Sequence, residues 1–477
     1  MKIFKSLILL TLALSLFSCQ DKKEEPPNIL VFLTDDLGYG DLGSYGHPVI
    51  RTPNLDALAS EGIRFTDFYS AAPVCSPSRV GLLTGRSPNR AGVYDFIPGY
   101  RKQEDLRHMV HLQEHEVTIP SLLKSAGYAT CLSGKWHCTS RFNNEAQPQP
   151  DHFGFDHWFA THNNAAPSHQ NPNNFVRNGE EVGEIEGYSA QIVVDEALNW
   201  LEHKEDDRPF YLQVTFHEPH EPIASPQELV DKYLPIAENE AQAMYFANVE
   251  NVDIAVGRLL DYLDQQGLDN TLIVFTSDNG PETLNRYQRA WRSYGSPGNL
   301  KGMKLWTTEA GFRVPGIMHW KGKTAGTTSD AVVSSLDLLP TFCELAGVEL
   351  PKVNLDGESV VSLFESGAFQ RSKPLIWSFY NALNEHRVAM RDGDWKILAR
   401  LRNDTTYLPM INNLYEGNEA LVRESELVDF ELYNLKNDIS ESKELSQTNP
   451  EELKRMQALL NQEYAELMAD SHIWKAE

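Results

Sequence analysis

Cysteine is scarce in this chain. Five cysteines in 477 residues are too few to build a disulfide scaffold. Basic residues are also in the minority, because 42 Lys and Arg stand against 67 Asp and Glu and the formal net charge is −25. This charge argues against nucleic acid or an anionic membrane surface as a general partner. It does not exclude a small anionic substrate, since a local pocket of basic side chains can create a positive field.

Long apolar runs and low-complexity tracts are missing as well. The N-terminal run Leu7–Phe17 is too short to span a bilayer, and it follows Lys2 and Lys5 and precedes Cys19. This pattern resembles a bacterial lipoprotein signal, in which the cysteine is lipidated after cleavage. An ordinary secretory signal with a chance cysteine is the alternative.

We therefore expect residues 1–19 to be a lipoprotein signal peptide and residues 20–27 to be a polar tether. The protein would then be exported to the periplasm, the outer membrane or the cell surface of a Gram-negative bacterium. Contact with the membrane would be through the lipid anchor only. The oligomeric state is left open.

Buried strands alternate with helical patterns along most of the chain. Continuous apolar runs at 28–34, 210–216 and 271–276 fit strands buried on both faces of a parallel sheet. Helical patterns lie between them, and they predict one α/β domain over residues 28–371. From 372 to 477 short strands precede one amphipathic helix, which predicts a small C-terminal α+β subdomain with an antiparallel sheet.

Acidic and amide side chains follow two of these strands. Asp35 and Asp36 end the first run, and Asp278 and Asn279 follow the run at 271–276. Ligands of open α/β sheets bind beyond the carboxyl ends of the strands, so these oxygens can converge. Such a set suits calcium or magnesium. Each pair alone could instead be a turn or a helix cap.

The segment Cys75-Ser-Pro-Ser-Arg79 precedes a helical pattern. Pro77 suits the first turn of a helix, which puts Cys75 near the helix N-terminus, where anionic groups are favoured. Arg79 follows one turn later and can reach the same point. A thiolate nucleophile paired with a histidine is one interpretation. That interpretation leaves the acidic pairs unexplained.

The same segment, continued by Val80-Gly-Leu-Leu-Thr-Gly-Arg86, resembles the signature of the type I, formylglycine-dependent sulfatases. The resemblance runs from about Asn28 to the segment 430–435. Other blocks resemble that family in the same order, with Ala310 as a small departure where glycine is more usual: residues 28–38, Gly134-Lys-Trp-His137, Pro209–His220, Ser277-Asp-Asn-Gly280, and Lys304 with Glu309-Ala-Gly311.

The resemblance implies an alkaline-phosphatase-like fold, with a large mixed, mostly parallel sheet sandwiched by helices. It implies that a formylglycine-generating or an anaerobic maturation enzyme converts Cys75 to formylglycine (3-oxoalanine). One hydroxyl of the aldehyde hydrate would attack sulfur, and the other would expel sulfate afterwards. Calcium, with magnesium as the alternative, would be held by the family's ligand positions: Asp35, Asp36, Cys75, Asp278 and Asn279.

The resemblance also assigns the surrounding side chains. Arg79 and His137 would contact the hydrate, while Lys135 and Lys304 would surround the sulfate oxygens. His220 would protonate the leaving alkoxide. His217 is placed either at the sugar or in a structural role.

The implied substrate is a sulfated carbohydrate such as ulvan, carrageenan, fucoidan or a glycosaminoglycan. A phosphonate monoester hydrolase or phosphodiesterase of the same superfamily is the enzymatic alternative. A catalytically silent glycan-binding lipoprotein is disfavoured, because every expected site position is filled.

Two segments are candidates for recognition of the sugar. Residues 141–186 are rich in His and Asn, and Trp158 or Phe159 could stack on a sugar face. An irregular connection held by Asn turns is the alternative. A second patch suits a carboxylate or a further sulfate and contains Arg286, Arg289, Trp291 and Arg292.

Overall fold

The computed structural model describes residues 25–100, 105–204, 206–283, 286 and 290–475. The expected signal peptide, Cys19 and most of the expected tether lie outside the described residues, so these remain predictions. None of the described helices is both long and apolar enough to cross a membrane.

A ten-stranded sheet forms the centre of the larger part of the molecule, and its order is β11-β2-β10-β9-β1-β8-β4-β5-β6-β7. The five central strands are parallel: β9 (Thr271–Ser277), β1 (Asn28–Thr34), β8 (Phe210–Thr215), β4 (Ala129–Lys135) and β5 (His157–Thr161). Antiparallel pairs join these to the flanking strands on both sides: β10 (Gly316–Trp320), β2 (Ile63–Phe65), β6 (Val176–Arg177) and β7 (Glu180–Glu181). The edge strand β11 (Thr327–Ser329) pairs parallel to β2.

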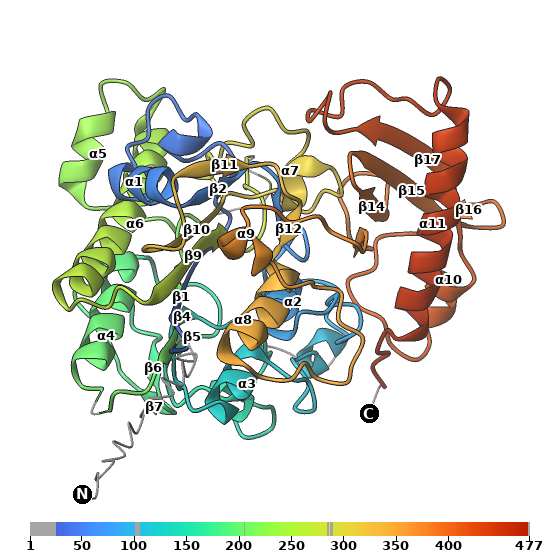
Figure 1. The fold of residues 1–477 in the computed structure, drawn as a ribbon. Helices are drawn as coiled ribbons and strands as arrows, with labels where there is room; N and C mark the ends of the chain where they lie inside the picture. The colour runs from blue at the N-terminus through green and yellow to red at the C-terminus, as the bar shows by residue number, and fades with distance from the viewer. Residues whose placement is uncertain (1–24, 101–104, 205, 284–285, 287–289, 476–477) are drawn as a thin grey trace, which may run out of the picture.

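Helices cover both faces of this sheet (Figure 1). One face packs against α1 (Pro53–Glu61), α4 (Ser189–Glu202), α5 (Gln227–Tyr233) and α6 (Glu240–Gln265). The other packs against α2 (Cys75–Thr84), α3 (Ile119–Ser125) and α8 (Leu338–Ala346).

The alternation of side chains along a strand explains the two covered faces. In β1, Ile29 and Val31 belong to the core beneath α2, α3 and α8, whereas Leu30 and Phe32 belong to the core beneath α1, α4, α5 and α6. The expected strands and helices of the α/β part are therefore confirmed.

A separate five-stranded antiparallel sheet follows toward the C-terminus, in red in Figure 1. It contains β13 (Leu375–Ser378), β14 (Val388–Asp392), β15 (Trp395–Asn403), β16 (Thr406–Tyr407) and β17 (Glu426–Asn434). Its core is completed by α10 (Glu419–Arg423) and by α11 (Pro450–Ala469). This confirms the expected C-terminal antiparallel sheet and helix. The exact boundary at 371/372 remains a prediction.

Several short elements lie outside the two larger sheets. The strands β3 (Phe68–Tyr69) and β12 (Val333–Ser334) pair with each other as a separate two-stranded sheet. The helix α7 (Glu309–Phe312) lies between β9 and β10, and α9 (Ser362–Glu365) lies between α8 and β13. Glu309 of α7 forms an ion pair of 2.9 Å with Lys396 of β15, and both side chains are completely buried. This contact joins the large sheet's side of the molecule to the C-terminal sheet.

Candidate active site

Four side chains converge at the carboxyl ends of the two neighbouring strands β1 and β9. The parallel register pairs Thr34 with Ser277, so the residues that follow each strand leave the sheet side by side. Ligand atoms of Asp35, Asp36, Asp278 and Cys75 all lie within 4.8 Å of one another, and all four residues are buried. The sequence prediction that both acidic pairs meet is supported by this geometry.

Asn279 completes this set of oxygens. Its Nδ2 donates to Asp36 Oδ1 at 2.8 Å, while its Oδ1 is buried and has no hydrogen-bond partner within the described part of the chain. Burial, with the charge of Asp35 next, raises the pKa of Asp278 although Arg79 pairs with it. Three crowded carboxylates and one unsatisfied amide oxygen are donors that fit a hard divalent cation.

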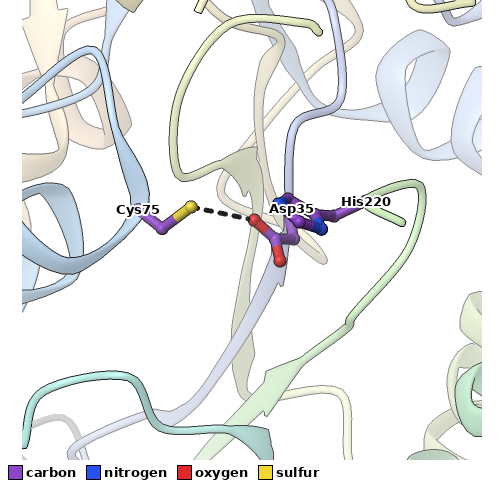
Figure 2. A group of neighbouring side chains, drawn as sticks. All are labelled: Asp35, Cys75 and His220. Carbon is purple, nitrogen blue, oxygen red and sulfur yellow. Dashed lines mark hydrogen bonds between the residues drawn. The ribbon is translucent and has the colours of Figure 1, made fainter. Parts of the chain in front are cut away.

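Cys75 is the first residue of α2, as the sequence predicts, and it points into this cluster. Its Sγ lies 3.3 Å from Asp35 Oδ1 (Figure 2) and 3.5 Å from Lys304 Nζ. Burial, followed by the charge of Asp35, raises the pKa of the thiol well above its ordinary value. A neutral thiol is a weak nucleophile. The geometry therefore disfavours the thiolate interpretation.

Three cationic side chains surround the carboxylates. Arg79 Nε donates to Asp278 Oδ2 at 2.9 Å, and Lys135 Nζ lies 2.5 Å from Asp35 Oδ2. Lys304 Nζ contacts both oxygens of Asp36 at 2.6 and 2.8 Å.

Each of these cations is nearly inaccessible to solvent. Burial alone would raise the pKa of Asp35, but Lys135 and the other nearby cations outweigh it and hold that pKa well below the usual range. The result is a buried site that holds several positive charges in a protein that is acidic as a whole.

Two histidines lie near this cluster: His220 contacts Asp36, and His137 contacts the backbone of Ile97. His220 Nε2 lies 3.7 Å from Asp36 Oδ2, and Figure 2 shows its ring behind Asp35. Burial, with Lys304 second, lowers the pKa of His220 to about 4. His137 adopts a φ of 55°, its Nε2 lies 3.0 Å from the carbonyl oxygen of Ile97, and burial lowers its pKa.

His217 lies outside the converging cluster. Its Nε2 is 2.8 Å from Thr161 Oγ1, its ring packs edge-on against Phe175, and its side chain is completely buried. These contacts are structural. A role for His217 at the sugar stays a prediction.

The two segments proposed for sugar recognition differ from expectation in detail. Trp158 and Phe159 are almost fully buried, and their rings pack against Phe142 and Phe175 respectively, so neither offers a face to a sugar. The stacking prediction for these two residues is wrong because β5 is an interior strand.

The second patch is partly described. Trp291 is half exposed, and the Arg292 guanidinium lies 4.0 Å from the centre of its ring. The backbone N–H of Arg292 donates to Glu221, the neighbour of His220, at 2.7 Å. Arg286 pairs with Glu282, and Arg289 lies outside the described residues.

Asp95 is a buried acidic residue near His137 that no sequence pattern identifies. It is buried, accepts a hydrogen bond of 2.7 Å from Asn381 Nδ2, and lies two residues before Ile97. Burial, opposed by two hydrogen bonds, raises the pKa of Asp95 to about 7. A single aspartate in an irregular segment carries no periodic or spacing signal that could have identified it.

Comparisons with known proteins agree with this geometry. A family model described as Sulfatase matches residues 27–348, and one described as N-sulphoglucosamine sulphohydrolase, C-terminal, matches residues 303–411. Human arylsulfatase A is 35% identical over 398 residues, which cover 78% of this chain and 74% of the human protein. Human N-acetylgalactosamine-6-sulfatase is 36% identical over 372 residues, which cover 74% of this chain and 68% of that protein.

A solved structure supports the same assignment. The structure of Ps i-CgsB in complex with k-i-k-neocarrahexaose superimposes with a TM-score of 0.76 at 28% identity, and covers 95% of both chains. The family model spans well over half of the chain, and the two human relatives exceed 30% identity. Together with the cluster around Cys75, these matches show that the chain belongs to the sulfatase family and is a sulfuric ester hydrolase.

Proposed function

We propose that this protein hydrolyses sulfate esters of a sulfated poly- or oligosaccharide, with a formylglycine derived from Cys75 as the nucleophile. Carrageenan, fucoidan, ulvan and glycosaminoglycans are the candidate glycans. Two similar proteins support a carbohydrate substrate. One relative is named N-acetylgalactosamine-6-sulfatase, and the structure of Ps i-CgsB contains a neocarrahexaose. The observation that carries the proposal is the placement of Cys75 Sγ among three carboxylates and Lys304.

The oxygen-rich cluster fits calcium, with magnesium as the alternative. Asp35, Asp36, Asp278 and Asn279 would hold the ion, together with the side chain at position 75. When bound, the ion would supply positive charge that lowers the pKa of a hydroxyl and polarises a sulfate oxygen. The unsatisfied Oδ1 of Asn279 is the strongest support for a bound cation in this position.

The chain's own cations bind and orient the sulfate group. Lys135 and Lys304 donate to the sulfate oxygens, and charge that develops on them in the transition state strengthens these contacts. Arg79 stays paired with Asp278. From there it binds the hydroxyls at position 75, which lie at the N-terminus of α2.

Two histidines serve proton transfer. Bound sulfate places negative charge beside His220 and opposes the burial and the Lys304 charge that lower its pKa, so that His220 protonates the leaving sugar alkoxide, with Lys304 as the second candidate donor. His137 accepts the proton of the second hydroxyl at position 75 as that oxygen returns to the aldehyde and sulfate leaves, and its buried Nδ1, which has no hydrogen-bond partner among the described residues, is the accepting atom. The main-chain carbonyl of Ile97 keeps the ring of His137 in one orientation.

Conversion of Cys75 requires a maturation enzyme, and we propose that this enzyme acts before folding is complete. Cys75, Ser76, Ser78 and Arg79 are each at most 3% exposed in the folded chain. A protein catalyst cannot reach a side chain at that depth without local unfolding. We also propose export as a lipoprotein lipidated at Cys19, located in the periplasm or at the outer membrane or cell surface, as the N-terminal sequence indicates.

The proposal is tested by incubating the converted protein with a panel of sulfated oligosaccharides and reading released sulfate by mass spectrometry. Matched sulfate and phosphate esters of one leaving group are run in parallel, because a phosphonate or phosphodiester hydrolase was the alternative. We expect sulfate release from at least one sulfated saccharide and a preference for the sulfate ester. Preference for the phosphate ester, or no release from any saccharide, would overturn it.

A further inference from the structure

A cavity of about 480 Å³ lies next to the segment that carries Tyr100. Tyr100, Arg141, Phe142 and His162 line it. The ring centres of His162 and His137 are 5.6 Å apart, and the backbone N–H of His137 donates to the carbonyl oxygen of His162 at 2.8 Å. His162 of the cavity wall therefore contacts His137 of the active site edge to face.

The backbone also connects the cavity to the nucleophile. The N–H of Ile97 donates to Ser76 Oγ at 2.9 Å, directly beside Cys75, and Tyr100 follows three residues later. Three residues span at most about 10 Å even when fully extended. The Tyr100 wall is thus within reach of an oligosaccharide whose sulfate sits at position 75.

Arg141 gives this cavity its charge. Its guanidinium lies 4.7 Å from the centre of the Tyr100 ring, and within the described ranges no carboxylate forms an ion pair with it. Stacking on an aromatic ring orients the planar guanidinium and leaves its edge for other acceptors. The edge of a guanidinium matches a carboxylate or a sulfate with two parallel hydrogen bonds.

The other walls suit a sugar ring. Tyr100 is 48% exposed, so part of its ring can cover a sugar face. Phe142 is fixed between Trp158 and His162, with ring centres 5.7 and 6.4 Å away. His162 Nε2 is buried and has no hydrogen-bond partner in the part of the chain that the structure covers, which leaves a polar atom for a hydroxyl or bridging water.

From these contacts we infer that the cavity is a second subsite, which binds an anionic sugar residue next to the residue that loses its sulfate. Arg141 would hold the anionic group, a carboxylate or a second sulfate, and Tyr100 would cover the ring. The inference rests on the proposed function and adds to it that the substrate is an oligosaccharide carrying at least two anionic groups.

The test uses three disaccharides built on the sulfated sugar that the panel above identifies. They share the scissile sulfate and differ in the neighbouring residue, which is neutral, a uronate or sulfated. We expect kcat/KM of the converted wild-type enzyme to be roughly 10- to 100-fold higher for an anionic neighbour than for the neutral one, as for a hydrogen bond to a charged group. The disaccharide with the higher kcat/KM shows whether the anionic group is the carboxylate of a uronate or a second sulfate.

Arg141→Gln should lower this ratio to within about twofold of one, and Arg141→Lys should retain part of it. Arg64→Gln is the matched control, because Arg64 also stacks on a tyrosine, Tyr45, but lines none of this cavity. Tyr100→Ala is a second variant at an exposed position and should also lower the ratio. Equal kcat/KM for all three disaccharides, or an unchanged ratio in Arg141→Gln, would overturn the subsite. Failure of the proposed function looks different, since no disaccharide would then release sulfate.

Discussion

The ammonium group of Lys304 contacts both carboxylate oxygens of Asp36, at 2.6 and 2.8 Å, although 267 residues separate them in the sequence. The same ammonium lies 3.5 Å from Cys75 Sγ. Lys304 thus stands between a predicted cation ligand and the predicted nucleophile. A cation bound to Asp36 would free Lys304 for the sulfate oxygens, so cation binding and substrate binding should be linked.

Calcium should stabilise the folded protein through this cluster. After treatment with a chelator, added calcium at about 100 times its Kd should raise the free energy of unfolding by about 2.7 kcal/mol, measured by chemical denaturation. Asp36→Asn should reduce this gain, whereas Asp264→Asn, at a side chain that is 78% exposed, should leave it unchanged. A parallel magnesium titration distinguishes the two ions. The cation assignment would be wrong if neither ion changed stability, or if Asp36→Asn kept the full gain.

Lys304→Ala should lower kcat by roughly 10²- to 10³-fold, because it removes a buried donor to oxygens that gain charge in the transition state. Steady-state rates of sulfate release measure this directly. Lys321→Ala is the control, since Lys321 pairs with Asp264 and Asp269 on the surface. An effect on KM alone would mean that Lys304 binds substrate and transition state equally.

The ion pair between Glu309 and Lys396 should make stability depend on pH. Burial would raise the pKa of Glu309, but Lys396 and Arg313 outweigh it and lower that pKa from 4.5 to about 2. A lowered folded-state pKa means that ionised Glu309 contributes stability above pH 4.5, and that this contribution is lost as the pH falls toward 2.

Glu309→Gln should therefore lower the free energy of unfolding by about 3 kcal/mol at pH 7, as expected for breaking a buried pair. The difference from wild type should shrink between pH 4.5 and the lowest pH at which both proteins fold. Denaturation at a series of pH values measures it, with the exposed Glu451→Gln as control. A difference that stays constant over this range would contradict the assignment.

Some features of this site could be predicted because they depend only on the local sequence pattern. Asp35 and Asp278 each follow a continuous apolar run, and parallel strands bring their ends together. Pro77 near the start of a helical pattern places Cys75 at the N-terminus of α2. Both predictions need only periodicity and the rule that sites lie at the carboxyl ends of strands.

Other parts depend on contacts between distant segments, which no local pattern encodes. Only the resemblance to sulfatases placed Lys135 and Lys304 at the same centre. The burial of Trp158 was missed because an aromatic residue in an interior strand and one at a binding surface have the same local sequence. Arg141 and Tyr100 are 41 residues apart in the sequence, and only the fold shows that they stack.

Conversion of Cys75 should precede folding. Purified, folded and unconverted protein should remain unconverted when a maturation enzyme is added, because the target residues are buried. The same protein unfolded in denaturant and diluted into the maturation reaction should be converted. Mass spectrometry of the peptide that contains Cys75 follows the replacement of the thiol by an aldehyde. Equal conversion of the folded and the unfolded samples would refute this order of events.

The most direct test of the account compares sulfate release by wild-type enzyme and by Cys75→Ala, both produced with a maturation enzyme. Cys343→Ala is the control, since Cys343 is a buried cysteine of α8 outside the cluster. We predict that Cys75→Ala loses roughly 10⁴-fold or more of kcat, as when a covalent nucleophile is removed, and that Cys343→Ala retains activity. Sulfate release by Cys75→Ala at the wild-type rate would contradict the central claim.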